Sequence, residues 1–276
     1  MKPAPFSYLR PDNLAAVTDA LQPNETLTKI VAGGQSLVPM LNLRLAPADR
    51  LVDIRGLPAL KQVEERPDSI VYGALLTHAA FEDRRVPDAS NGLMPRMAAG
   101  IAFRSVRNRG TIGGALALAD PAADWLTTAI ALEARMHVHG PDGDRVVPAE
   151  EFVLGPYFTA LGEADVLTAI EIPRRPATER WGVCKVSVKV GEYAESLAIA
   201  LLDRTQRMAR VVVGATDGAP LVLERAAQAL LDNAPDQELR TIVAQELSAA
   251  EREFSPAKLT MHTTTALRAA RDAAAP

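Results

Sequence analysis

Two short segments with adjacent glycines carry the residues best suited to chemistry. They read Ala32-Gly33-Gly34-Gln35-Ser36 and Thr111-Ile112-Gly113-Gly114-Ala115. Because glycine has no Cβ atom, such a backbone can reach positive φ and let an anion come close. Consecutive N–H groups in a bend of this kind form a concavity that holds phosphate oxygens, and Ser36 and Thr111 add hydroxyl groups. Two such segments are suited to hold one diphosphate from both sides.

Adjacent glycines are also typical of plain tight turns, and this alternative stays open for either segment taken alone. Neither segment fits the G-x-G-x-x-G pattern of dinucleotide-binding βαβ units. Neither carries the Gly-Lys-Ser/Thr of a P-loop. Residue types and spacing alone therefore predict no more than a phosphate-binding site.

The cysteine count limits the redox chemistry that this chain can perform. Cys184 is the single cysteine in the sequence. Iron–sulfur clusters are held by about four cysteine thiolates, and structural zinc sites also rely on several cysteine or histidine ligands. Redox chemistry in this chain would therefore use an organic cofactor, or depend on a cluster that another chain holds.

Charge and hydropathy exclude other classes of function. The formal net charge is −4, and the basic residues are scattered apart from one group, Arg104, Arg107 and Arg109. We therefore expect no nucleic-acid partner. No apolar run reaches the about 20 residues of a membrane span, and the first residues lack the apolar run of a secretory signal. The expected location is the cytoplasm, with no membrane span.

A buried strand and a helix are expected on either side of the first glycine pair. The apolar, β-branched run at 27–32 predicts a strand that stops at Gly33, and a helix is expected from Leu37. Further helices are expected at 13–21, 77–85, 94–102 and 125–134, and a loop at 104–114. Further strands are expected at 50–54, 69–73, 135–139 and 145–148, with a hairpin turn at 141–143.

A proline-rich, charged connector at 172–176 is the expected domain boundary. Strands are expected beyond it at 183–189, 196–203 and 208–213. The rest of the chain, 223–274, is rich in alanine and is expected to be helical, with breaks near Pro235 and Pro256.

Several stretches together resemble one known family. They are VAGGQSLVPMLNLRLA at 31–46, LVDI at 51–54, VRNRGTIGGALALADPAAD at 106–124, GPYFTAL at 155–161, LTAIEIP at 167–173 and KVGEYA at 189–194. In this order they resemble the FAD-binding (medium) subunits of molybdenum hydroxylases, the family of the carbon monoxide dehydrogenase medium subunit and the xanthine dehydrogenase FAD-binding domain. The resemblance covers essentially the whole chain.

The resemblance implies an α+β fold with a two-lobed FAD-binding domain of the vanillyl-alcohol-oxidase-like, PCMH type. This domain would span 1–174, with lobes of about 1–57 and 58–174. A small α+β C-terminal domain, like that of carbon monoxide dehydrogenase flavoproteins, would span 175–276.

The resemblance also implies which residues contact FAD. Both glycine segments would face the diphosphate; Ala115 stands where relatives have Asn or Ser, so a backbone contact would survive there but a side-chain hydrogen bond would not. The remaining implied contacts are Asp124 to the polyol, Leu167 through its backbone, Lys185 near the isoalloxazine, Ile101, and Tyr193 beside the flavin ring. Without the resemblance, Asp124 would be a helix N-terminal charge, Lys185 a solvent-facing strand residue, Leu167 and Ile101 core residues, and Tyr193 a packing residue.

The function implied is electron transfer in a heterotrimer. A large partner subunit would hydroxylate substrate at a molybdopterin-type molybdenum cofactor, and a small partner with two [2Fe-2S] clusters would pass electrons to FAD in this chain and on to an external acceptor. No catalytic residue is expected in this chain, and the complex would be a dimer of heterotrimers. The alternatives are a self-contained FAD-dependent oxidoreductase of the same fold and a non-catalytic flavin-binding protein. The organic substrate and the acceptor are not named by these motifs.

Overall fold

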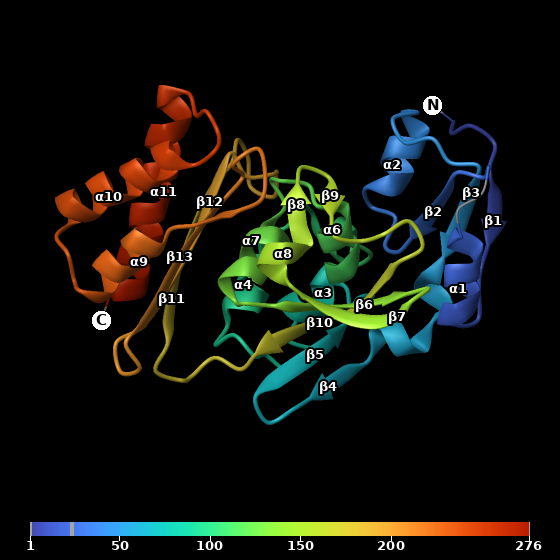
Figure 1. Cartoon of the computed structure of the whole chain (residues 1–276), viewed down its shortest axis with the longest axis horizontal. Coiled ribbons are helices and arrows are strands. Elements are labelled where there is room, and N and C mark those ends of the chain that lie inside the picture. Colours follow the sequence, from blue (N-terminus) through green and yellow to red (C-terminus); the bar gives the residue numbers. More distant parts are fainter. Residues whose placement is uncertain (1, 23–24, 276) are drawn as a thin grey trace.

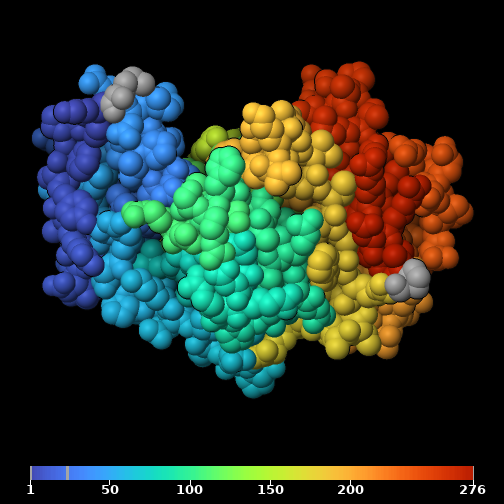
Figure 2. Space-filling model, turned by 180° about the vertical axis from the view of Figure 1, so that it is seen from behind, coloured from blue at the N-terminus to red at the C-terminus, as the bar shows by residue number. Residues whose placement is uncertain are grey.

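Three units of sheet and helix follow one another along the chain and along the long axis of the molecule (Figure 1). The computed structural model describes residues 2–22 and 25–275. Seen from behind, the same order runs from the N-terminal unit through the middle unit to the C-terminal unit (Figure 2). The mixture of helices and strands confirms the expected α+β class.

The N-terminal unit is a small parallel sheet with two helices. Its elements are β1 (Ser7–Leu9), α1 (Leu14–Leu21), β2 (Thr28–Val31), α2 (Leu37–Asn42) and β3 (Arg50–Asp53), followed by the 3-10 turns η1 (Ile54–Gly56) and η2 (Pro58–Lys61). The strand order is β1-β3-β2, with both pairings parallel. The Asn13 side chain caps α1 by accepting from the amide of Ala16. β2 is an edge strand that ends directly before the first glycine segment, so the sheet positions that segment at its edge.

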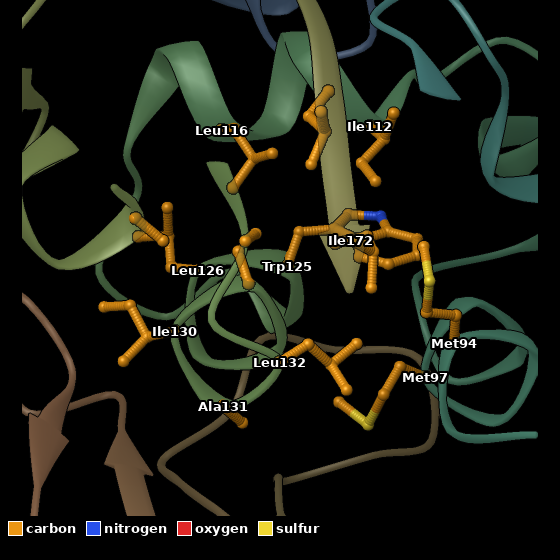
Figure 3. Close-up of a cluster of buried hydrophobic side chains, with 14 of the residues drawn as sticks. Met94, Met97, Ile112, Leu116, Trp125, Leu126, Ile130, Ala131, Leu132 and Ile172 are labelled. Carbon is orange, nitrogen blue, oxygen red and sulfur yellow. The ribbon is translucent and has the colours of Figure 1, made fainter. Parts of the chain in front are cut away.

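The middle unit is a five-stranded antiparallel sheet with short helices. Its strands are β4 (Val63–Glu65), β5 (Ser69–Gly73), β10 (Val166–Pro173), β6 (Arg135–Gly140) and β7 (Gly143–Pro148), in this spatial order. Its helices are α3 (His78–Glu82), α4 (Leu93–Ala99), α5 (Arg104–Arg107), α6 (Ile112–Leu118), α7 (Asp124–Ala131) and α8 (Ala149–Phe152). A two-stranded hairpin of β8 (Val153–Gly155) and β9 (Phe158–Thr159) lies beside them. The main core gathers around Trp125, with Met94, Leu126 and Ile130 pointing into the same cluster (Figure 3).

The C-terminal unit is an antiparallel sheet covered by three helices. The strands are β11 (Arg180–Val186), β12 (Ser196–Asp203), β13 (Met208–Gly214) and β14 (Leu221–Val222), paired in chain order. The helices α9 (Glu224–Leu231), α10 (Asp236–Ala249) and α11 (Pro256–Ala274) lie on the outer face of this sheet (Figure 1). β12 is buried along its whole length, because α11 covers one face and α7 packs on the other. The connector at 172–176 begins in the last two residues of β10 and leads toward β11, and the division into domains of 1–174 and 175–276 stays a prediction.

Two expectations from the sequence are wrong. The segment 104–114 contains the one-turn helix α5 and the start of α6, rather than only loop. Arg104 and Arg107 hold α5 in place through ion pairs with Glu82, which local sequence does not reveal. The strand expected at 183–189 instead spans Arg180–Val186, because its first residues pair with β12. The other expected elements differ mainly at their ends: the helix expected at 77–85 stops at Glu82, and that expected at 94–102 spans Leu93–Ala99.

Candidate cofactor site

A cavity of about 710 Å³ lies where the three units meet. Cofactor pockets in proteins have volumes of about 300–1,000 Å³, so a dinucleotide is a ligand of suitable size. The residues expected to contact FAD line this cavity with two exceptions, Ile112 and Lys185. Those that line it are Ala32, Gly33, Gly34, Gln35, Ser36, Ile101, Thr111, Gly113, Gly114, Ala115, Asp124, Leu167 and Tyr193.

The two glycine segments both line this cavity, and they are in contact with each other at its wall. A Cβ atom added to Gly33 would lie 2.2 Å from the carbonyl oxygen of Arg109, in the turn that leads to the second segment. A Cβ atom on Gly114 would lie 3.6 Å from the Cβ atom of Ala32. Only glycine at position 33 allows this approach of backbone to backbone. The segments are therefore close enough to bind one small group together.

The first glycine segment offers a run of free amides. The N–H groups of Gly33, Gly34, Gln35 and Ser36 donate no hydrogen bond within residues 2–22 and 25–275. Gly34 has φ +72°, and Ser36 precedes α2 without capping it through its side chain. Backbone N–H groups in folded proteins find partners, so donors that line a cavity are available to a ligand. Their closeness in one bend suits the oxygens of a phosphate.

Four of the five amides of the second glycine segment donate within the protein, whereas that of Thr111 has no acceptor within the described residues. The amide of Ile112 donates to Leu76 O at 3.0 Å, and that of Gly113 donates to Ala74 O at 2.9 Å. The amide of Ala115 donates to Thr111 O, and that of Gly114 donates to the Thr111 hydroxyl at 3.1 Å. Among these four amides, only that of Gly114 is held by a side chain that can turn away. The missing side chains at Gly113 and Gly114 let this segment pack closely against Ala74 and the first glycine segment.

Ile112 is the first of the two expected residues that lie outside the cavity. Its side chain is buried, and it points with Leu116 from α6 into the core around Trp125 (Figure 3). It anchors the second glycine segment to the core.

Lys185 is the second expected residue that lies outside the cavity, and it forms an ion pair with Asp124, which lines it. Its Nζ atom lies 2.9 Å from each carboxylate oxygen of Asp124, with the hydrogen bond directed at Oδ2, and it also donates to Gly100 O. Asp124 is 5% exposed at the start of α7, and Oδ1 has no hydrogen-bond donor within the described ranges. Burial raises the pKa of Asp124 above the usual carboxyl value, while Lys185 opposes that rise. Lys185 is therefore a charge partner of the cavity wall rather than a solvent-facing strand residue.

The rim of the cavity beside Tyr193 combines α5, the turn at Ile101 and Ala102, and the loop between β11 and β12. Arg107 donates to the carbonyl oxygens of Ile101 and Ala102, and so fixes the turn that carries Ile101. Gly191 has φ +87° and packs against this turn, where a Cβ atom would lie 2.8 Å from Ala102 O. The loop between β11 and β12 thereby brings Tyr193 to the cavity.

Reasoning from the sequence did not identify several other cavity residues, among them His78, Asp120, Trp125 and Tyr157. His78 had no apparent role, and yet its ring accepts a hydrogen bond from the Trp125 indole. The Tyr157 hydroxyl donates to Asp120 at 3.1 Å. These pairs join residues 47 and 37 positions apart, so no local pattern could reveal them.

Residues 4–175 match the family described as FAD binding domain in molybdopterin dehydrogenase. The chain belongs to this family. It is 33% identical to the carbon monoxide dehydrogenase medium chain of Hydrogenophaga pseudoflava, over 82% of this chain and 79% of that one. It is 34% identical to the nicotine 6-hydroxylase medium subunit of Paenarthrobacter nicotinovorans, over 79% of this chain and 77% of that one.

Solved structures agree with this membership. A carbon monoxide dehydrogenase structure from Hydrogenophaga pseudoflava, lacking the Mo-pyranopterin moiety of its molybdenum cofactor, superposes with a TM-score of 0.92 and 31% identity. That match covers 100% of this chain and 99% of the other. Quinoline 2-oxidoreductase from Pseudomonas putida 86 gives a TM-score of 0.89 at 31% identity, over 99% and 98%. This FAD-binding molybdopterin dehydrogenase chain therefore has the expected two-lobed PCMH-type fold with its C-terminal unit, and it is part of an oxidoreductase.

The cavity residues fit FAD. The free amides of the first glycine segment match an anionic diphosphate, and the absence of a Cβ atom at Gly33 lets the second segment come close beside them. Asp124 lines the cavity, and a carboxylate is a suitable acceptor for a hydroxyl group such as those of the polyol. Apolar side chains of Ile101 and Leu167 line the cavity, as suits the ring systems of FAD.

None of the helices in the described part of the chain has the length and apolar character of a membrane span.

Proposed function

We propose that this chain is the FAD-carrying electron-transfer subunit of a heterotrimeric molybdenum hydroxylase. It takes electrons from two [2Fe-2S] clusters in a small partner subunit and passes them to an external acceptor. A large partner subunit hydroxylates the substrate at a molybdopterin-type molybdenum cofactor. The observation that carries the proposal is the cavity lined by two adjacent glycine segments, in a chain of the FAD-binding family.

The proposal gives tasks to the glycine segments, Asp124 and Tyr193. The amides of Gly33 to Ser36 hold the diphosphate, and Gly113 and Gly114 let the second glycine segment pack closely against Ala74 and Ala32 beside it. Asp124, held by Lys185, accepts from the polyol, and Tyr193 covers the flavin end. FAD supplies the redox chemistry when bound, whereas the protein binds, orients and shields it. No side chain of this chain is assigned to substrate hydroxylation.

Partner subunits are supported by the relatives and by the cavity rim. The relatives are medium chains or medium subunits by name. The rim carries exposed apolar side chains on both sides of the contact between Gly191 and Ala102, since Phe103 is 70% exposed and Val190 is 95% exposed. Exposed apolar groups gathered at a functional site are typical of interaction surfaces. We propose that this rim faces the iron–sulfur partner, within a cytoplasmic dimer of heterotrimers.

A Val190→Glu chain should assemble with its partners about tenfold more weakly, because a charge would be buried in the interface without a partner. Its flavin content should stay unchanged, since the Val190 side chain lies outside the cavity wall. Affinity co-purification of the complex gives the measurement. The matched control is Met208→Glu, an exposed apolar residue at the end of the C-terminal sheet opposite the β11–β12 loop that carries Val190. Equal assembly of the two variants would contradict the placement of the interface.

The proposed function is tested on the complex as the cell assembles it. Co-purification with metal analysis should find molybdenum, iron and flavin together. After chemical reduction of the iron–sulfur clusters without oxygen, the flavin absorption band should bleach within the complex. A yellow chain that turns over an organic substrate without partners would establish the self-contained oxidoreductase instead. A flavin that stays oxidised beside reduced clusters would establish the non-catalytic flavin-binding protein.

A further inference from the structure

His78 lies between the second glycine segment and the buried Trp125. It is the first residue of α3, after the cap Thr77, and its amide donates to Gly110 O at 2.9 Å. Its Nδ1 atom is 3.0 Å from the indole Nε1 of Trp125. Both side chains are buried, with 5% and 1% exposure. The ring is therefore held in one place beside the turn that begins the second segment.

The contact with Trp125 fixes the position of the ring proton. An indole N–H can only donate, so Nδ1 of His78 must be the acceptor, and the proton of the neutral ring is on Nε2. Burial, with a smaller contribution from Arg107, lowers the pKa of His78 to about 4. The ring is neutral at neutral pH, and Nε2–H is a hydrogen-bond donor.

The Nε2–H group faces the cavity. His78 lines the cavity, and a Cβ atom added to Gly110 would lie 2.7 Å from Nε2, so the ring edge lies against the turn before Thr111. Nε2 has no hydrogen-bond acceptor within the described ranges. Within those ranges, the side-chain polar atoms that have neither a partner nor contact with solvent are Asp124 Oδ1, Thr127 Oγ1, His262 Nε2 and Thr263 Oγ1. His78 Nε2 is not one of them, so it keeps contact with solvent. A free donor that keeps access to the cavity is available to a ligand.

Four of the five amides of the second glycine segment are used within the protein, so this side of the cavity offers an anion few backbone donors besides the amide of Thr111. We propose that His78 is a further cofactor-binding residue, whose Nε2–H donates to an oxygen of the FAD diphosphate beside Thr111. Trp125 is the positioning residue that keeps this proton on Nε2. The inference rests on the proposed function, and it adds a contact that neither the glycine motifs nor the expected site residues include.

Two substitutions separate the donor from the structural contact. In His78→Asn the amide oxygen replaces Nδ1, so the Trp125 contact is kept and the donor is lost. In His78→Gln the amide nitrogen replaces Nε2, so the donor is kept and the Trp125 contact is lost. We expect His78→Asn to bind FAD about tenfold more weakly and His78→Gln to stay within about threefold, because a hydrogen bond to a charged group is lost only in the first. Fluorescence titration of the full chain, freed of flavin, measures both.

Two simpler ligands identify the part of FAD that His78 contacts. ADP carries a diphosphate without a flavin, and riboflavin carries the flavin without a diphosphate. His78→Asn should weaken ADP, measured by competition with FAD, by the same factor as FAD and should leave riboflavin unchanged. Thermal unfolding should show His78→Gln to be the less stable variant, since it leaves the Trp125 N–H unpaired.

The opposite ranking would overturn the inference. If His78 only supports the fold, His78→Gln would lose more FAD than His78→Asn, following their stabilities. Equal loss of FAD and riboflavin in His78→Asn would also reject a diphosphate contact. A natural chain that binds no FAD would reject the proposed function itself, which is a different outcome from a natural chain that binds FAD beside variants with the wrong ranking.

Discussion

A Gly33→Val chain is expected to bind FAD at least about 100-fold more weakly than the natural chain. The added Cβ atom would lie 2.2 Å from Arg109 O and 2.8 Å from the Cα atom of Gly110. Both atoms belong to the backbone and cannot rotate away, so the two glycine segments must separate and the free amides must turn. Hydrogen bonds to charged groups contribute about 1.5–3 kcal/mol each, and losing two of them corresponds to a factor of about 100.

Flavin-to-protein ratio and fluorescence titration measure this loss. The matched control is Gly155→Val, because a Cβ atom at that position meets nothing within 4 Å and the residue lies in a strand. Gly113 is a poorer test, since its Cβ atom would lie 2.4 Å from the Ala74 side chain and 2.7 Å from its carbonyl oxygen, so folding itself would suffer. A Gly33→Val chain with a full complement of flavin would show that the first segment does not hold the cofactor.

The features predictable from the sequence are those whose cause is local. Adjacent glycines before a helix indicate a bend with accessible amides, and the structure gives Gly34 the positive φ that such a bend uses. Asn13 and Thr77 cap the helices that follow them, as their residue types predict. β12 and β13 were readable as strands because their apolar, β-branched runs are bounded by turn residues.

The features that were not predictable depend on contacts between distant residues. The amides of Ile112 and Gly113 are occupied because Leu76 and Ala74, about 40 positions earlier in the chain, lie beside them. No property of the segment Thr111 to Ala115 reveals those partners. The hydrogen bond between Trp125 and His78 likewise joins residues far apart in the sequence, and no local pattern predicts it. The sequence thus indicates where a phosphate could approach, and only the fold shows which donors are free to meet it.

The pair of Lys185 and Asp124 gives the second large effect, this time on stability. A Lys185→Met chain should be less stable by about 3 kcal/mol at pH 7.5, because Asp124 would keep a buried charge without its partner. In a chain of this size such a loss lowers Tm by roughly 6–12 °C. Thermal unfolding of the flavin-free chain gives the measurement without any contribution from FAD binding.

The pH dependence of this loss has a defined sign. Burial raises the pKa of Asp124 in the folded chain above its value in the unfolded chain, and removal of Lys185 raises it further. A folded state with the higher pKa binds the proton more readily, so the stability difference between variant and natural chain should shrink as pH falls from 7.5 toward 5. The double variant Lys185→Met/Asp124→Asn carries no charge at this site, and it should recover most of the loss at pH 7.5. If the double variant is as unstable as Lys185→Met and the loss does not change with pH, packing of the lysine stem rather than the buried charge accounts for the effect.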